Sequence, residues 1–431
     1  MEPKYYKHKL KNGLKVLFIH HPNNKLVSIK FTSSIGEDQE KLNSKEYEIV
    51  HTLEHLFGYF TSKKYPNAKK NIFNLEKNGI QTNAEVTATQ TLYNLVGHKK
   101  NFEYMFDLIS NTFLSFIIDK NIFSQEKNAI SQELNDILND IWYKLDLSIN
   151  KSMYYNHIRS LCQKEKKQNL KNLQINSVTN FYKKHYYPNN TCITISGDLD
   201  WKKIMSKIQA NFNVLKPGNI LHNNKPIVFN KELKFIKTNV LSYNLYLIFR
   251  IKINEFEPDF KLYNIISDLL TDGLNSILYK ILRGKGLVYS IQSDILSHPL
   301  RKDFSYFIIN TQTEKKNILI VIRLILQELY NLKKNRINDN DIILMKNKLE
   351  LEYLQNNNKN KIEHYEEMYT DYYMWDQKIK NNKEKYLEYN NFNVDRIKLL
   401  CKIFRKDNMV INYGGNSNLN KDIIKIIKEF N

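Results

Sequence analysis

Apolar and polar positions follow two different periods along the chain, and together they predict a mixed α+β protein. Residues 26–33 alternate and predict a strand, and residues 5–19 predict a hairpin closed by an Asn-Gly turn. Residues 79–97 are rich in Thr and Val and predict further strand structure. Residues 101–116 and 121–140 repeat apolar side chains every three to four positions, so they predict a pair of helices.

A shorter helix is predicted over residues 44–60, where apolar side chains again recur with helical spacing. Ser44 is the expected N-cap, because its hydroxyl can accept a hydrogen bond from the first turn and acidic residues follow it closely. The apolar positions of this helix are Ile49, Leu53, Leu56 and Phe60.

The same helix carries three side chains with metal-binding chemistry. His51 and His55 are one turn apart and point the same way, so their two imidazoles can bind one Zn²⁺ ion. Glu54 lies beside His55, poorly placed as a ligand but close to any water on the metal. This H-x-x-E-H spacing is the reverse of the commoner H-E-x-x-H order. The alternative is a surface helix with two solvated histidines.

The predicted helix 121–140 offers a third ligand. Glu126 and Glu133 are seven residues apart, so they lie two turns apart on one face. A carboxylate on that face can complete a His₂Glu site and leave the fourth position to water. Spacing alone does not choose between the two glutamates.

The H-x-x-E-H sequence at residues 51–55 is followed at residues 124–133 by SQE-x₆-E. With these two motifs the chain resembles the inverzincin peptidases, the family of pitrilysin, insulin-degrading enzyme and the mitochondrial processing peptidase. The resemblance implies one Zn²⁺ per chain, held by His51, His55 and Glu133. It implies that Glu54 is the general base and that Glu126 supports the site without binding the metal. For Glu126, the alternative is a solvated helix charge.

The resemblance also implies substrate-contacting residues. Asn83 and Ala84 would lie on an exposed edge strand to which a peptide adds as a further strand; the alternative is an interior strand with a solvated Asn. Arg283 and Tyr289 match the family's second signature and would hold the substrate and polarise the scissile carbonyl. An ordinary loop arginine and strand tyrosine are the alternative for these two.

The second half of the chain resembles the first. Asn408 and Gly415 in RKDNMVINYGGN match Asn190 and Gly197 in PNNTCITISGD. The separation between these matching residues, applied to the predicted helix that carries His51 and His55, leads to residues 267–273, where no His or paired carboxylate remains. We therefore expect an internal duplication whose second copy has lost the metal.

This duplication predicts the fold class and the domains. We expect two homologous α/β sandwich domains, each with a mixed, mostly antiparallel sheet packed by helices. The catalytic zinc-binding domain is predicted over residues 1–212 and the metal-free domain over residues 236–431. Residues 213–235 contain Pro, Gly and Asn without a period, which predicts a linker.

Composition narrows the class further. The 431 residues carry a formal net charge of +20, spread along the chain as Lys, which is typical of a solvated surface. Basic charge alone favours a nucleic-acid-binding protein, but no zinc finger or RNP motif accompanies it. Three widely spaced cysteines predict no disulfide framework and indicate a reducing compartment.

The expected protein is a cytoplasmic zinc endopeptidase. No signal peptide, transit peptide or apolar run of membrane-spanning length is evident, so neither a membrane nor a nucleic acid is expected as a partner. By resemblance, the substrate is an unfolded or extended peptide, cleaved in a chamber of four domains. Because this chain supplies two, a homodimer or a heterodimer with a related chain is implied. The alternative within this class is a non-catalytic subunit of a heterodimeric processing peptidase.

Overall fold

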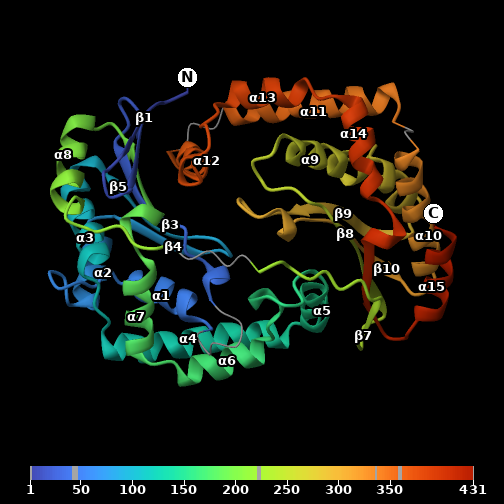
Figure 1. Cartoon of the computed structure of the whole chain (residues 1–431), viewed down its shortest axis with the longest axis horizontal. Coiled ribbons are helices and arrows are strands. Elements are labelled where there is room, and N and C mark those ends of the chain that lie inside the picture. The colour runs from blue at the N-terminus through green and yellow to red at the C-terminus, as the bar shows by residue number, and fades with distance from the viewer. Residues whose placement is uncertain (1, 41–46, 221–224, 335–336, 358–361, 431) are drawn as a thin grey trace. The chain divides into compact units, whose positions relative to one another are not determined.

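A computed structural model describes residues 2–40, 47–220, 225–334, 337–357 and 362–430 (Figure 1). The chain divides into two compact units, and neither is continuous in sequence. Unit 1 comprises residues 1–138, 161–224 and 357–381, and unit 2 comprises residues 139–160, 225–356 and 382–431. The predicted division at 213–235 follows chain order, whereas the two units exchange two segments.

Unit 1 is built on a six-stranded mixed sheet in which only β2 and β6 run parallel. The predicted hairpin and the predicted strand 26–33 are confirmed. In spatial order the strands are β1 (Lys4–Lys9), β2 (Lys15–His20), β6 (Thr191–Gly197), β3 (Leu26–Ser33), β5 (Thr91–His98) and β4 (Gln81–Val86). The helices are α1 (Ile49–Phe57), α2 (Ala68–Lys77), α3 (Phe102–Ser115), α4 (Lys120–Asn139), α6 (Gln163–Asn172), α7 (Ile175–His185), α8 (Trp201–Phe212) and α12 (Ile362–Met374).

Strand alternation gives the first sheet two buried faces. On β2, Val16 and Phe18 point into the main core, which also contains side chains of α1, α3, α7 and α8. Leu17 and Ile19 point the other way and pack under α12, in a smaller cluster that includes Tyr369. Helices therefore cover both faces of the sheet that supports α1.

Unit 2 repeats this plan with five strands and again one parallel pair, β7 with β11. In spatial order its strands are β7 (Lys234–Lys237), β11 (Met409–Gly415), β8 (Ser242–Arg250), β10 (Tyr306–Glu314) and β9 (Val288–Leu296). Its helices are α5 (Tyr143–Met153), α9 (Pro258–Thr271), α10 (Ile318–Lys333), α11 (Asp339–Asn357), α13 (Asn382–Asn390), α14 (Val394–Leu400) and α15 (Asn420–Glu429).

The two sheets have equivalent topology, which confirms the predicted duplication at the level of fold. The order β7-β11-β8-β10-β9 matches β2-β6-β3-β5-β4, and each pair of neighbours has the same relative direction. The helix equivalent to α1 was expected at residues 267–273, but α9 ends at Thr271. The alignment of the two copies, which is based on their last strands, is therefore shifted at this helix. The shift arises because the loops that precede the two helices differ in length.

Each half of the chain contributes one helix to the other unit. The far face of the second sheet packs against Leu145, Ile149 and Met153 of α5, which comes from the first half. The far face of the first sheet packs under α12, from the second half. In sequence, neither half contains every helix that covers its own sheet.

One buried carboxyl lies under α12. Glu366 is 0% exposed, and Ser28 donates a hydrogen bond of 2.9 Å to its carboxyl group. Lys30 Nζ lies 3.8 Å from Glu366 Oε2. Burial, opposed only in part by Lys30 and Ser28, raises the pKa of Glu366 to about 6. The folded protein therefore holds this carboxyl protonated at mildly acid pH, where an unfolded chain would ionise it.

We expect the free energy of unfolding to fall by about 2 kcal/mol as the pH rises from about 4.5 to about 6, because only the unfolded state releases the Glu366 proton in that window. Protonated Glu366 contributes its full stabilisation below about pH 4.5, and this stabilisation is lost above about pH 6. Glu366→Gln should remove this fall, whereas Glu367→Gln, at an exposed position of α12, should keep it. Urea unfolding across this range measures both, and parallel profiles for wild type and Glu366→Gln would contradict the assignment.

The three cysteines, Cys162, Cys192 and Cys401, are free, as the sequence predicts. Among the described residues, no helix has the length and apolar character needed to cross a bilayer.

Candidate metal centre

The helix α1 is shorter than the sequence predicts. It begins at Ile49, and Glu48 is its N-cap with a left-handed backbone at φ 65°. A right-handed helix cannot continue backwards through that conformation, so the expected start at Ser44 is wrong. Ser44 itself lies outside the described residues. The helix ends at Phe57 with Gly58 as C-cap, which leaves both histidines inside it.

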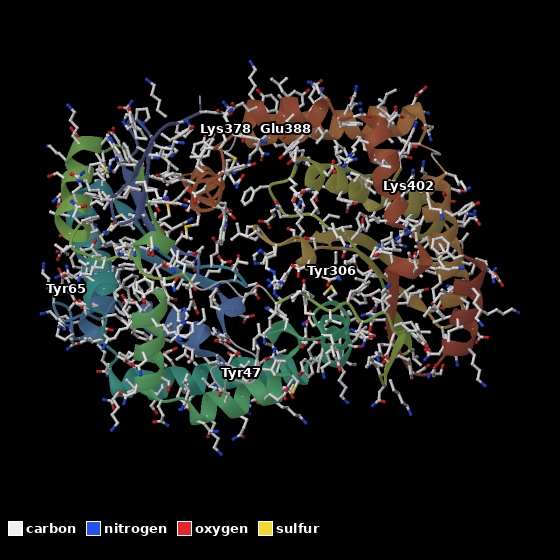
Figure 2. All side chains as sticks on the ribbon, viewed as in Figure 1. Tyr47, Tyr65, Tyr306, Lys378, Glu388 and Lys402 are labelled. Atoms are coloured by element: carbon white, nitrogen blue, oxygen red, sulfur yellow. The ribbon has the colours of Figure 1, made fainter. Side chains whose placement is uncertain are left out.

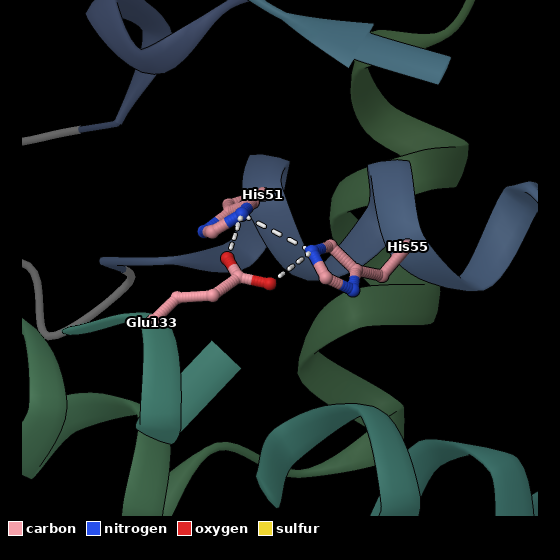
Figure 3. A group of neighbouring side chains, drawn as sticks. All are labelled: His51, His55 and Glu133. Atoms are coloured by element: carbon pink, nitrogen blue, oxygen red, sulfur yellow. Dashed lines mark hydrogen bonds and ion pairs between the residues drawn. The ribbon is translucent and has the colours of Figure 1, made fainter. Parts of the chain in front are cut away.

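Two histidines of α1 and one glutamate of α4 converge (Figure 3). His51 Nε2 lies 3.2 Å from His55 Nε2 and 3.3 Å from Glu133 Oε2. Glu133 Oε1 lies 3.7 Å from His55 Nε2. One ligand atom from each residue falls within 4.8 Å of the others, which is close enough to surround one cation.

The second nitrogen of each imidazole is held by a carboxylate. His55 Nδ1 lies 2.8 Å from Glu126 Oε2, and the Tyr59 hydroxyl donates to the other oxygen of Glu126 at 2.6 Å. His51 Nδ1 lies 2.9 Å from Glu48 Oε2. Both Nδ1 atoms are therefore engaged, and both Nε2 atoms face the common centre. Metal-binding histidines in proteins are commonly fixed in this way.

Charge around His51 favours a proton on the ring when no cation is present. Burial by itself lowers the pKa of His51, but the hydrogen bond to Glu48 and the charges of Glu48 and Glu133 outweigh burial and raise it. A metal ion that binds His51 competes with this proton, so its affinity falls as the pH is lowered.

Glu54 borders the group without belonging to it. Its Oε2 lies 3.7 Å from His55 Nε2, and its side chain is 15% exposed. Burial raises the pKa of Glu54, and the nearby carboxylates of Glu133 and Glu126 add to this increase, which the histidines oppose only in part. The group is thus a partly accessible carboxyl beside three potential ligands.

Asn83 and Ala84 lie on β4, at one edge of the first sheet. They pair with Asn94 and Tyr93 of β5, and no described strand pairs with their other side. Both residues therefore lie at a sheet edge, and their role in substrate binding stays a prediction. β4 also contacts α1, so this edge runs beside the helix that carries the histidines.

Arg283 and Tyr289 belong to unit 2, whereas the three converging side chains belong to unit 1. Arg283 ends a short helical turn and Tyr289 is in β9. The Arg283 guanidinium carbon lies 6.0 Å from the centre of the Tyr289 ring, and Tyr289 is 74% exposed. The two are therefore neighbours, and their substrate-binding role stays a prediction.

Sequence reasoning missed Glu48, Tyr59 and Lys166. Glu48 comes three residues before His51 and Tyr59 four residues after His55, so one-turn spacing could have indicated both. Lys166, whose Nζ lies 3.2 Å from Glu48 Oε1, is far away in sequence, and no local pattern indicates it.

A sequence model of the insulinase family (peptidase family M16) matches residues 15–157. A second, described as the peptidase M16 inactive domain, matches residues 172–349. The chain belongs to the M16 peptidase family. Its second copy matches the inactive type, and the only group of three potential metal ligands among the described residues lies in the first copy.

Two curated relatives illustrate the similarity. An insulin-degrading enzyme homolog of Dictyostelium discoideum is 26% identical over 196 residues, which cover 45% of this chain and 20% of that protein. An uncharacterized zinc protease of Rickettsia felis is 24% identical over 356 residues, 79% of this chain and 81% of that protein. The match thus spans about a fifth of the first relative and most of the second.

Solved structures share the two-domain fold. A protease from Helicobacter pylori superposes with a TM-score of 0.81 at 16% identity, covering 96% of this chain and 99% of that one. A peptidase M16 inactive domain from Pseudomonas fluorescens gives the same TM-score and identity, covering 96% and 98%. The predicted fold class is confirmed by this likeness.

Proposed function

We propose that this chain is a zinc-dependent endopeptidase that hydrolyses peptide bonds in unfolded or extended peptides. The observation that carries the proposal is the convergence of His51, His55 and Glu133 with Glu54 at their side. His51, Glu54 and His55 come from α1 and Glu133 comes from α4, so the arrangement depends on the fold and not on sequence proximity alone.

The donors fit zinc. Two imidazole nitrogens and one carboxylate are the set found at catalytic zinc sites that keep a fourth position open. Because both Nδ1 atoms are engaged by carboxylates, the Nε2 atoms of His51 and His55 are the ones left to bind the ion. When bound, zinc supplies the Lewis acidity that activates water and polarises a carbonyl.

Glu54 is the proposed general base. It takes a proton from the attacking water and returns that proton to the leaving amine, so it ends the cycle unchanged. Burial raises the pKa of Glu54. Glu54 is therefore a better proton acceptor near neutral pH than a fully solvated carboxylate would be. Its position at 3.7 Å from His55 Nε2 keeps it next to the metal position without making it a ligand.

The substrate is proposed to bind as a strand along β4. The unpaired edge of β4 offers main-chain hydrogen bonds to an extended peptide. Asn83 is exposed on this strand, and Ala84 is half-buried and packs against the core. Such recognition favours unfolded chains, because most backbone N–H and C=O groups of a folded protein are already paired.

The resemblance to four-domain chambers supports a dimer, either of two copies or with a related chain. Arg283 and Tyr289 would then contact the substrate bound at the zinc centre of the partner chain. Tyr289 is exposed enough to do so. Sedimentation of the purified chain, alone and with zinc, measures whether two copies associate.

A zinc and cleavage assay tests the function. We expect one zinc per chain, cleavage of an unfolded fluorogenic peptide, loss of cleavage with a chelator and recovery when zinc is added back. Zinc binding without cleavage by the chain alone would favour the non-catalytic subunit of a heterodimer. Failure to bind zinc would contradict the proposal.

A further inference from the structure

Glu48 is held in an unfavourable state at the start of α1. It is a non-glycine residue at φ 65°, and its side chain is 2% exposed. A left-handed backbone and a buried carboxylate each cost free energy unless other contacts compensate. Its backbone is fixed, because the Glu48 carbonyl accepts hydrogen bonds from the amide and the hydroxyl of Thr52, at 2.9 and 2.5 Å.

Two partners compensate for the burial of the Glu48 carboxylate. His51 Nδ1 lies 2.9 Å from one oxygen, and Lys166 Nζ lies 3.2 Å from the other. Burial by itself raises the pKa of Glu48, but the hydrogen bond from His51 and the charge of Lys166 outweigh burial and lower it. Each oxygen of the buried carboxylate thus has its own partner.

Lys166 reaches Glu48 from α6, and its side chain is only 11% exposed. Burial lowers the pKa of Lys166, but the charges of Glu37 and Glu48 raise it above its ordinary value, so the ammonium stays charged. One turn further along α6, Asn169 donates to the carbonyl of buried Tyr47, just before Glu48. Tyr47 is labelled in Figure 2. Two contacts thus tie α6 to the segment that leads into α1.

We infer that Glu48 and Lys166 form a positioning pair that orients the imidazole of His51 for the metal ion. The inference rests on the proposed function and extends it to residues that do not touch the substrate. By accepting the Nδ1–H of His51, Glu48 selects the tautomer whose Nε2 lone pair faces Glu133 and His55. Lys166 holds the second oxygen of Glu48 from α6.

The two histidines are then oriented by separate, unlike pairs. Glu126 with the Tyr59 hydroxyl holds His55, and Glu48 with Lys166 holds His51. The second pair includes a buried cation, so its loss removes charge as well as a hydrogen bond. The pair therefore stabilises one orientation of His51 before any metal binds.

Three variants separate positioning from folding. Glu48→Gln keeps the size and an acceptor for Nδ1–H but loses the charge. The double variant Glu48→Gly with Lys166→Met removes both members, and glycine suits the left-handed backbone, so the fold is not strained. Glu37→Gln is the matched control, because Glu37 also pairs with Lys166, at 3.4 Å, yet does not contact His51.

The test measures the zinc dissociation constant of the full chain by competition with a chromogenic chelator, beside the melting temperature of the metal-free chain. We expect the constant to rise about 10-fold for Glu48→Gln and about 100-fold for the double variant. Glu37→Gln should bind zinc like the wild type. The metal-free double variant should melt no earlier than Glu37→Gln.

Three results would overturn the positioning pair. They are wild-type zinc affinity in both Glu48 variants, an equal loss in Glu37→Gln, or zinc losses that merely follow lower melting temperatures. Each leaves the proposed function intact, provided that the wild type binds one zinc per chain. Absence of zinc from the wild type would instead contradict the proposed function itself.

Discussion

Glu54→Gln is expected to reduce peptide cleavage by at least about 10³-fold while zinc remains bound, since general acid–base catalysis contributes roughly 10²–10⁴-fold and Glu54 acts in both proton transfers. The amide has the size of the carboxyl but cannot accept the proton. The fold should tolerate the change, because burial already raises the pKa of Glu54 and so disfavours its charge. Turnover of an unfolded fluorogenic peptide, measured beside zinc content, tests this.

The control for this experiment is Glu76→Gln, at an exposed position of α2. It makes the same chemical change away from the three converging side chains and should leave the turnover number unaltered. Near-normal turnover in Glu54→Gln would show that another group transfers the proton. Loss of zinc from Glu54→Gln would instead mean that this carboxylate helps to bind the metal.

His51→Ala is expected to weaken zinc binding by about 10²–10³-fold. Structural zinc sites bind with about 10–16 kcal/mol, and an even share among four ligands is about 2.5–4 kcal/mol. The loss also leaves one oxygen of buried Glu48 without its hydrogen-bond partner, so the metal-free variant should melt earlier than the wild type. Zinc competition and thermal melting measure the two effects separately.

His8→Ala is the matched control, because His8 is exposed on β1 and is not among the converging ligands. It should bind zinc and cleave peptide like the wild type. Unchanged zinc affinity in His51→Ala would remove this histidine from the ligand set. The proposed centre would then have to be placed elsewhere in the chain.

Much of the centre could be predicted because its parts are local. His51, Glu54 and His55 lie within two turns of one helix, and helical spacing fixes which way they point. The second helix was expected over residues 121–140 and is found at Lys120–Asn139. The choice of Glu133 rather than Glu126 as the metal ligand needed the family resemblance, since both side chains lie on one face of this helix.

The remainder depends on contacts between distant segments. Lys166 meets Glu48 only because α6 packs against the start of α1. The exchange of α5 and α12 between units is likewise invisible in the sequence, because both helices carry an ordinary apolar face. The start of α1 was misplaced because the positive φ of Glu48 follows from its buried contacts and not from its residue type.

Anomalous diffraction at the zinc edge, from crystals grown with zinc, tests the central claim most directly. The account predicts one strong peak at about 2.0–2.2 Å from His51 Nε2, His55 Nε2 and an oxygen of Glu133. Glu54 should lie beside the peak, outside that distance. A peak at other residues, or none between these three side chains, would contradict the account.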